Sequence, residues 1–130
     1  MRKSVFLLFL FPLLYACDPA RVLIISAKPN TAVQVYGKRD LLPYYHRDTS
    51  NQVCLQVPVP GYADSLETTY MYGLGYWEGY SLNQFSRSID SIVLHKSKGI
   101  ERINDSTSIK EYLFSHRQGM FNSVIRIEAK

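Results

Sequence analysis

The chain has little of what a catalytic or metal-binding site needs. It contains only two cysteines and three histidines among 130 residues. His46, His95 and His116 show no HExxH or HxH spacing, and Cys54 has no second thiolate with which to form a zinc site. No serine lies in a G-x-S-x-G motif, and residues 73–75 (GLG) lack the lysine and third glycine of a phosphate loop. The sequence therefore predicts no catalytic residue, metal or cofactor.

Charge is also sparse, which argues against a nucleic-acid partner. Charged residues make up 20% of the chain, hydrophobic residues 46%, and the formal net charge is +4. Aspartates such as Asp18 and Asp40 lie among the basic residues, and no Lys/Arg run is long enough for a nucleic-acid-binding arm. This composition is typical of a globular protein, and we expect one domain over residues 21–130.

The N-terminal segment has the pattern of a signal peptide. Arg2 and Lys3 precede the uncharged, apolar stretch 5–15, which only Pro12 interrupts. This stretch is too short for the roughly 20 residues of a membrane-spanning helix, but it fits the apolar region of a secretory signal. We therefore predict that residues 1–16 are removed on export.

The residues at the predicted cleavage point indicate a lipid anchor. Leu14 is too bulky at −3 for an ordinary A-x-A site, whereas Leu14, Tyr15, Ala16 and Cys17 together resemble the lipobox of bacterial lipoproteins. In that family the cysteine carries diacylglycerol, and its new amino terminus is usually acylated, for example with palmitate. The resemblance implies lipidation of Cys17, a short tether over 17–20, and anchoring to an envelope membrane, with the outer membrane favoured over the inner.

The state of the second cysteine depends on the first. If Cys17 is lipidated, Cys54 has no intramolecular partner, and its strand-like neighbours predict a buried, unreactive thiol. If Cys17 is not lipidated, a Cys17–Cys54 disulfide is open in an oxidising compartment.

The first half of the mature chain reads as strands. Four consecutive aliphatic residues within 21–26 predict a strand at the centre of a sheet or buried on both faces. A turn at 28–31 and the alternating stretch 32–36 then predict an antiparallel hairpin. Residues 37–51 form a polar loop with room for a short helical turn. The alternating strand 53–59 contains Pro58, so it should lie at an edge or end at Val57.

The second half adds strands and one helix. Residues 68–80 could form a strand interrupted by glycines, which predicts a bulge or turn, and 83–88 read as a polar connection. Residues 89–96 and 122–128 are strand-like. Residues 104–116 predict a helix, with Ser108 and Glu111 at capping-box spacing. The whole pattern predicts a mainly β, antiparallel, immunoglobulin-like sandwich with one short C-terminal helix before the last strand.

One segment is rich in aromatic side chains. It contains Tyr70, Tyr72, Tyr76, Trp77 and Tyr80. Such rings suit stacking on sugars or contact with a protein surface, because one end is apolar and the other hydrogen-bonds. The same residues are also good strand formers, and β-sandwiches often bury a tryptophan. The sequence leaves both interpretations, binding surface and core, open.

The layout of the chain resembles small lipoproteins of unknown function from the Bacteroidales. The similar parts are the lipobox, the strand-and-turn stretch 22–36, the lone Trp77, the strand 89–94, and the ending at 109–127. The resemblance implies an envelope location and a β-rich fold, and it carries no activity or site.

Three functions are consistent with these observations. The first is a non-catalytic envelope lipoprotein that binds a glycan or a partner protein, with the aromatic segment as its surface. The second is a small envelope enzyme that uses Cys54, or His46 and His95. The third is a structural subunit of an envelope complex.

Overall fold

The protein is built from two β-sheets and two α-helices. The computed structural model describes residues 18–43, 50–59, 61 and 66–130, so the predicted signal peptide (1–16) and Cys17 lie outside it. The strands of the described part are β1 (Ala20–Ala27), β2 (Ala32–Lys38), β3 (Gln52–Val57), β4 (Glu67–Leu74), β5 (Ile89–Lys96), β6 (Gly99–Ile103), β7 (Arg117–Gln118) and β8 (Val124–Ala129). They form two four-stranded sheets, in the orders β4-β1-β8-β7 and β3-β2-β5-β6.

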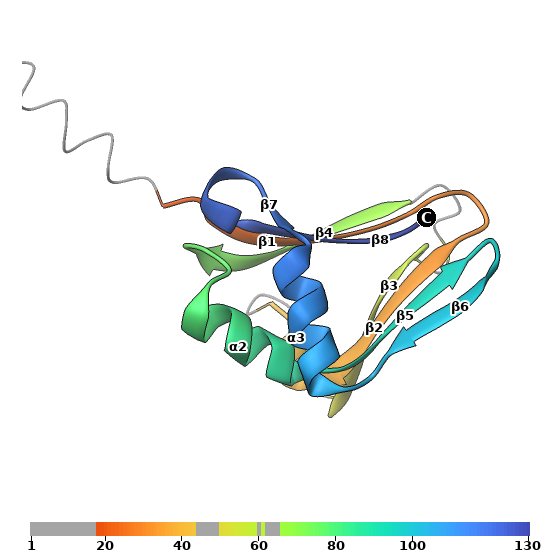
Figure 1. Cartoon of the computed structure of the whole chain (residues 1–130), viewed down its shortest axis with the longest axis horizontal. Helices are drawn as coiled ribbons and strands as arrows, with labels where there is room; N and C mark the ends of the chain where they lie inside the picture. The colour runs from red at the N-terminus through yellow and green to blue at the C-terminus, as the bar shows by residue number, and fades with distance from the viewer. Residues whose placement is uncertain (1–17, 44–49, 60, 62–65) are drawn as a thin grey trace, which may run out of the picture.

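The helices fill the space between the sheets where these lie furthest apart. They are α2 (Gly79–Ser88) and α3 (Ser106–Ser115), and short 3-10 turns form η1 (Arg39–Leu41) and η2 (Met120–Asn122). Figure 1 shows the sheets converging at one end and the two α-helices closing the wider end. Neither α-helix of the described part has the length and apolarity needed to span a bilayer.

The first sheet is organised around β1. As the aliphatic run predicts, β1 is a central strand, with β4 antiparallel on one side and β8 parallel on the other. Leu23 pairs with Ile125 and Ile25 with Ile127, and all four side chains are fully buried. The parallel pair contradicts the predicted, purely antiparallel sandwich. It arises because the chain between β1 and β8 passes through the second sheet and α3 before it returns to β1 in the same direction.

The second sheet corrects the predicted hairpin. β2 pairs with β3 and β5, not with β1, so the turn at 28–31 carries the chain from one sheet to the other. Each of β1 and β2 buries its apolar face in the shared core, which a two-stranded hairpin alone could not do. β3 lies at the edge of its sheet and ends at Val57, as predicted, and β5 covers the predicted residues. The exposed strand β6 was not predicted, because most of its residues lack the apolar alternation of a buried strand.

The helices confirm one prediction and overturn another. α3 was predicted, but its N-cap is Asp105, whose carboxylate accepts hydrogen bonds from the N–H groups of Thr107 (3.0 Å) and Ser108 (3.2 Å). A capping box that starts at Ser108 is therefore wrong. α2 replaces the predicted connection at 83–88, so the fold has a second helix that the immunoglobulin-like prediction did not contain. The mainly β, two-sheet part of the prediction holds.

Candidate functional site

A β-bulge lies where β1 and β4 pair. Ala20 pairs with Leu74 and Val22 with Met71, so Arg21 faces two residues, Tyr72 and Gly73. Gly73 has φ +94°, a left-handed conformation that glycine adopts at little cost. Arg21 Nη2 donates to the carbonyl oxygen of Tyr72 at 3.1 Å. The irregularity that the glycines predicted is therefore present, and it brings Arg21 against β4.

Three rings pack together behind this bulge. The Trp77 ring is 4.7 Å from Phe85 and 5.4 Å from Tyr72 between centroids, and Tyr72 is 5.0 Å from Phe85. Trp77 is only 2% exposed, and its Nε1 donates to the carbonyl oxygen of Val22 at 3.0 Å. The Tyr72 hydroxyl donates to the carbonyl oxygen of Leu41 at 2.6 Å. Buried Trp and Tyr groups of this kind stabilise the fold through both ring area and satisfied polar atoms.

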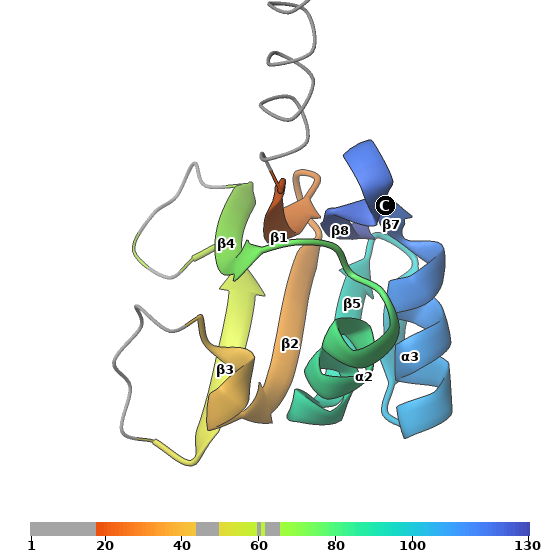
Figure 2. The ribbon, with the colours of Figure 1, turned by 90° about the vertical axis from the view of Figure 1, so that its left-hand side faces the viewer.

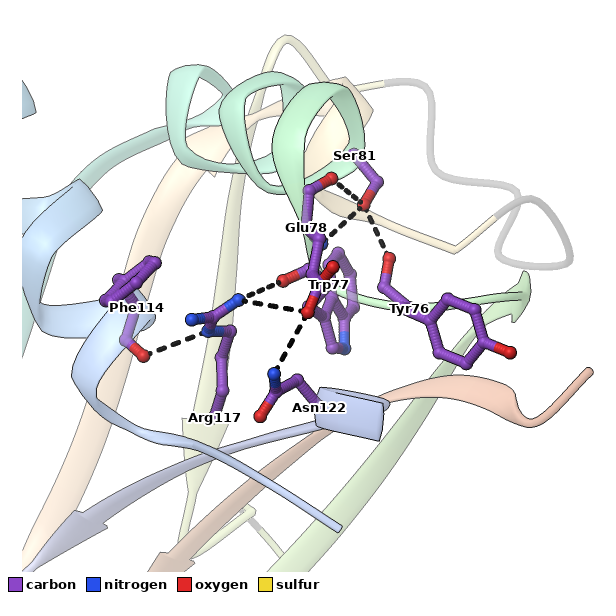
Figure 3. A network of polar contacts seen from close by, with 7 residues as sticks. All are labelled: Tyr76, Trp77, Glu78, Ser81, Phe114, Arg117 and Asn122. Carbon is purple, nitrogen blue, oxygen red and sulfur yellow. Dashed lines mark hydrogen bonds and ion pairs between the residues drawn. The ribbon is translucent and has the colours of Figure 1, made fainter. Parts of the chain in front are cut away.

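Arg117 of β7 contacts the residues immediately before α2 and holds the start of this helix in place. Its Nη1 donates to the carbonyl oxygen of Trp77 at 3.1 Å and lies 3.8 Å from Glu78 Oε1. Its Nε donates to the carbonyl oxygen of Phe114 at 3.0 Å, and its guanidinium lies 3.8 Å from the centre of the Phe114 ring. Asn122 Nδ2 donates to Glu78 Oε1 at 3.0 Å. Figure 3 shows these groups converging on the residues that precede the helix.

A groove of about 620 Å³ runs beside α2, between this helix, η1 and the bulge. Its aromatic lining is Tyr72, Trp77, Tyr80 and Phe85. Tyr80 is 78% exposed, so its ring is available to a ligand, whereas Trp77 is 2% exposed and presents almost no ring surface to the groove. A groove of this size is within the range of small-ligand sites.

The groove carries more positive than negative charge. Arg21, Lys38 and Arg87 line it, against the single carboxylate of Asp40. The Arg21 guanidinium lies 5.7 Å from the Trp77 ring centroid, a cation–π distance. Its Nε is buried and has no hydrogen-bond partner among the residues that the structure describes. An unpaired, buried donor costs free energy, so the position of this guanidinium beside Trp77 is not optimised for stability alone.

Neutral hydrogen-bonding groups complete the lining. Asn83 and Gln84 project from α2 and offer amide groups, while the Ser81 hydroxyl is bonded to backbone groups of Tyr76 and Glu78. An exposed ring, amides and guanidinium groups in one groove can bind a polar molecule by stacking and by hydrogen bonds at its edges. The sequence interpretation missed these α2 residues because it treated them as a loop. The spacing of Leu82 and Phe85, both buried, is the helical signal that could have revealed them.

The structure divides the aromatic segment. Tyr72, Trp77 and Tyr80 meet in the groove, while Tyr70 is 9% exposed and belongs to the core. Tyr76 lies outside the groove lining, with its ring 5.6 Å from that of Phe121. The core interpretation describes Tyr70 and Trp77, and the surface interpretation can apply only to the exposed rings.

Cys54 and His95, the two residues of the alternative enzyme hypothesis that the structure describes, do not lie close together. Cys54 of β3 pairs with Tyr36 of β2, whereas His95 of β5 pairs with Ala32 of β2. Tyr36 and Ala32 are four residues, or roughly 13 Å, apart along β2. Cys54 is exposed, which contradicts the predicted buried thiol, because its side chain points away from the face that carries Val53 and Leu55. Desolvation nevertheless raises the pKa of the Cys54 thiol, and a hydrogen bond with Tyr36 offsets part of this rise. A raised pKa disfavours the thiolate, the nucleophilic form.

The two histidines that the structure describes have structural partners. His95 Nε2 lies 2.9 Å from Gln34 Oε1, and His116 caps the C-terminus of α3, with Nδ1 2.7 Å from the carbonyl oxygen of Tyr112. His116 therefore lies at the end of the helix, as predicted. His46 falls outside the described residues. Within the described ranges, no three His, Cys, Asp or Glu side chains are grouped closely enough to hold a metal ion.

Comparison with known proteins finds no match: no family model fits the chain, and no curated protein or solved structure is significantly similar to it. Function must therefore be argued from the groove and from the sequence of the N-terminal segment.

Proposed function

We propose that this chain is a non-catalytic envelope lipoprotein, anchored through Cys17, whose domain binds an acidic glycan in the groove beside α2. The observation that carries the binding proposal is the position of the exposed Tyr80 ring within a groove that Arg21, Lys38 and Arg87 make positive. The lipobox at Cys17 supports the anchor, with the outer membrane favoured over the inner.

The composition of the groove favours a saccharide over an apolar ligand. Sugars bind through a stacking ring together with planar amides and charged groups that bond their hydroxyls, and Tyr80, Asn83 and Gln84 provide these groups. The excess of guanidinium and ammonium groups favours carboxylated or phosphorylated sugars, because charge-assisted hydrogen bonds are the stronger kind. A partner protein, or a role as a structural subunit, is the competing function.

A titration tests the binding proposal. Trp77 is the only tryptophan in the chain and lines the groove, so its fluorescence reports on occupancy. The mature, lipidated protein in detergent should respond to an oligogalacturonate and more weakly to an uncharged malto-oligosaccharide. Arg87→Gln should weaken oligogalacturonate binding at least about tenfold, since hydrogen bonds to charged groups contribute about 1.5–3 kcal/mol.

The matched control is Arg102→Gln, which removes the same charge from exposed β6, outside the groove lining. Its affinity should equal that of the wild type. If neither saccharide changes the fluorescence or the heat of mixing, the glycan proposal is wrong, and stoichiometric co-purification of an envelope protein would favour the competing function.

A labelling experiment tests the anchor separately. The chain expressed in a bacterium with radiolabelled fatty acid should incorporate label, and Cys17→Ser should not. An unlabelled wild-type protein would refute the anchor and leave the saccharide titration unaffected.

A further inference from the structure

The first described residues are held at one end of the domain. The N–H of Gly75 donates to the carbonyl oxygen of Pro19 at 2.7 Å, and Ala20 pairs with Leu74 at the end of β4. On the other side of β1, the N–H of Val22 donates to the carbonyl oxygen of Ser123, directly after η2. The chain therefore enters the fold between the end of β4 and η2. Figure 1 shows the start of β1 and the end of β4 at the same end of the molecule, which faces the viewer in Figure 2.

Large apolar side chains surround this entry point. Leu74 is 68%, Met120 72% and Phe121 65% exposed, and Tyr76 joins them through its edge-to-face contact with Phe121. We call these four residues the apolar rim. Scattered exposed apolar residues are ordinary, but several from separate segments grouped at one place indicate a contact surface.

The backbone of η2 holds part of this rim outward at a cost. Phe121 has φ +55° and Asn122 φ +58°, in the left-handed region that side chains other than glycine or asparagine rarely adopt. Hydrogen bonds from Trp77 N to Asn122 O (3.0 Å) and from Asn122 Nδ2 to Glu78 fix this conformation. A bulky phenylalanine at a left-handed position that leaves most of its ring exposed gains little for folding beyond its contact with Tyr76, which points to a role in binding.

We infer that the apolar rim docks into the interfacial region of the lipid bilayer to which Cys17 is anchored. This inference rests on the lipid anchor of the proposed function. Ala20 is three residues from Cys17, so the rim lies within roughly 10–11 Å of extended chain from the lipid. Aromatic and aliphatic side chains at that height match the headgroup and upper acyl region, and they add a second membrane signal to the acyl chains.

Docking of the rim would set the orientation of the domain. A flexible tether alone would leave the domain free to rotate above the membrane. Contact through Leu74, Tyr76 and η2 places the start of α2 near the bilayer, because Glu78 follows Tyr76 and is bonded to Asn122. The hairpin between β5 and β6 then lies at the far end of the molecule (Figure 1).

Tryptophan probes in the lipidated protein test this inference. Two rim variants, Phe121→Trp and Leu74→Trp, are reconstituted in vesicles of phosphatidylethanolamine and phosphatidylglycerol that contain brominated phosphatidylcholine. Leu74→Trp is the second rim probe and lies on strand backbone, outside η2. Ile100→Trp, equally exposed but on β6, is the matched control, and the wild type gives the contribution of buried Trp77. We expect brominated lipid to quench most of the added fluorescence of both rim probes and little of that of Ile100→Trp.

Flotation of the same vesicles separates docking from anchoring. If the protein floats with the vesicles but neither rim probe is quenched more than Ile100→Trp, the docking inference is wrong and the anchor stands. If the protein does not float, the anchor is wrong and the docking inference falls with it.

Discussion

Helices α2 and α3 have the same length, ten residues each, but different interactions hold them in place. α3 starts at Asp105, whose carboxylate caps its first turn, and it places Ile109 and Leu113 on one buried face. α2 follows Glu78, whose N–H donates to Ser81 Oγ, and long-range contacts of Trp77 and Arg117 determine its position. Local sequence predicts α3, whereas the position of α2 depends on tertiary contacts of Trp77 and Arg117 as well as on its local cap.

This difference matters because α2 lines the candidate binding groove. Short helices are marginal on their own, so packing provides most of their stability. Because distant residues hold α2 in place, its polar side chains need not pack in the core and can face a ligand. The cost is that mutations far from the groove should disturb it.

Removal of the Trp77 ring should have the largest effect. Trp77→Ala is expected to lower the free energy of unfolding by about 3–5 kcal/mol, since it removes a fully buried ring that packs on Tyr72 and Phe85. Hydrogen exchange should accelerate in α2 more than in α3. Equal acceleration in both helices would contradict the proposed difference between them. Tyr80→Ala, which alters an exposed ring of α2, is the control and should leave stability nearly unchanged.

Loss of the Arg117 contacts should come next. Arg117→Gln is expected to cost about 2 kcal/mol, because the largely buried guanidinium donates to two carbonyl oxygens, of Trp77 and Phe114. Urea unfolding measures this loss, and the saccharide affinity should fall with it if α2 shifts. Lys110→Gln, on the exposed face of α3, removes one charge without those contacts and should leave stability unchanged.

Tyr112 should make α3 sensitive to alkaline pH. Burial, followed by the charge of Glu101, raises the pKa of Tyr112 to about 12. The folded state therefore holds the phenol proton more tightly than the unfolded chain, so this stabilisation is complete below pH 10 and is lost as pH rises toward 12. Between these pH values the free energy of unfolding of the wild type should fall by at most about 2 kcal/mol more than that of Tyr112→Phe, as measured by chemical unfolding. Parallel curves for the two proteins would refute the assignment.

The cap of α3 should give the smallest effect. Hydrogen bonds from Ser108 and Thr107 lower the pKa of Asp105, so its stabilisation is present at neutral pH and is lost as pH falls through that lowered pKa. Asp105→Ala should lower Tm by a few degrees at pH 7 and have little effect in strong acid. Asp105→Asn, which keeps an acceptor for the cap, should lower Tm less than Asp105→Ala does. If Asp105→Asn lowered Tm as much as Asp105→Ala, the charge of Asp105 would matter more than the cap geometry.

Only part of the candidate site could be predicted from the sequence. The aromatic residues stood out because they are close together in the chain, and three of the five line the groove. Arg21, Lys38 and Asp40 could not be found this way, because they come from β1, the end of β2 and η1, which are adjacent only in the folded chain. The groove needs the bulge and α2, and both depend on contacts between distant segments.

The sequence by itself determined the strands with strong apolar patterns, helix α3, the edge position of β3 and the irregularity near Gly73, because each follows from local spacing, proline or glycine. The tertiary structure alone decided that β1 and β2 belong to different sheets and that β1 and β8 run parallel. Those features depend on which buried faces meet across the core, and neighbouring residues in the chain do not encode this choice.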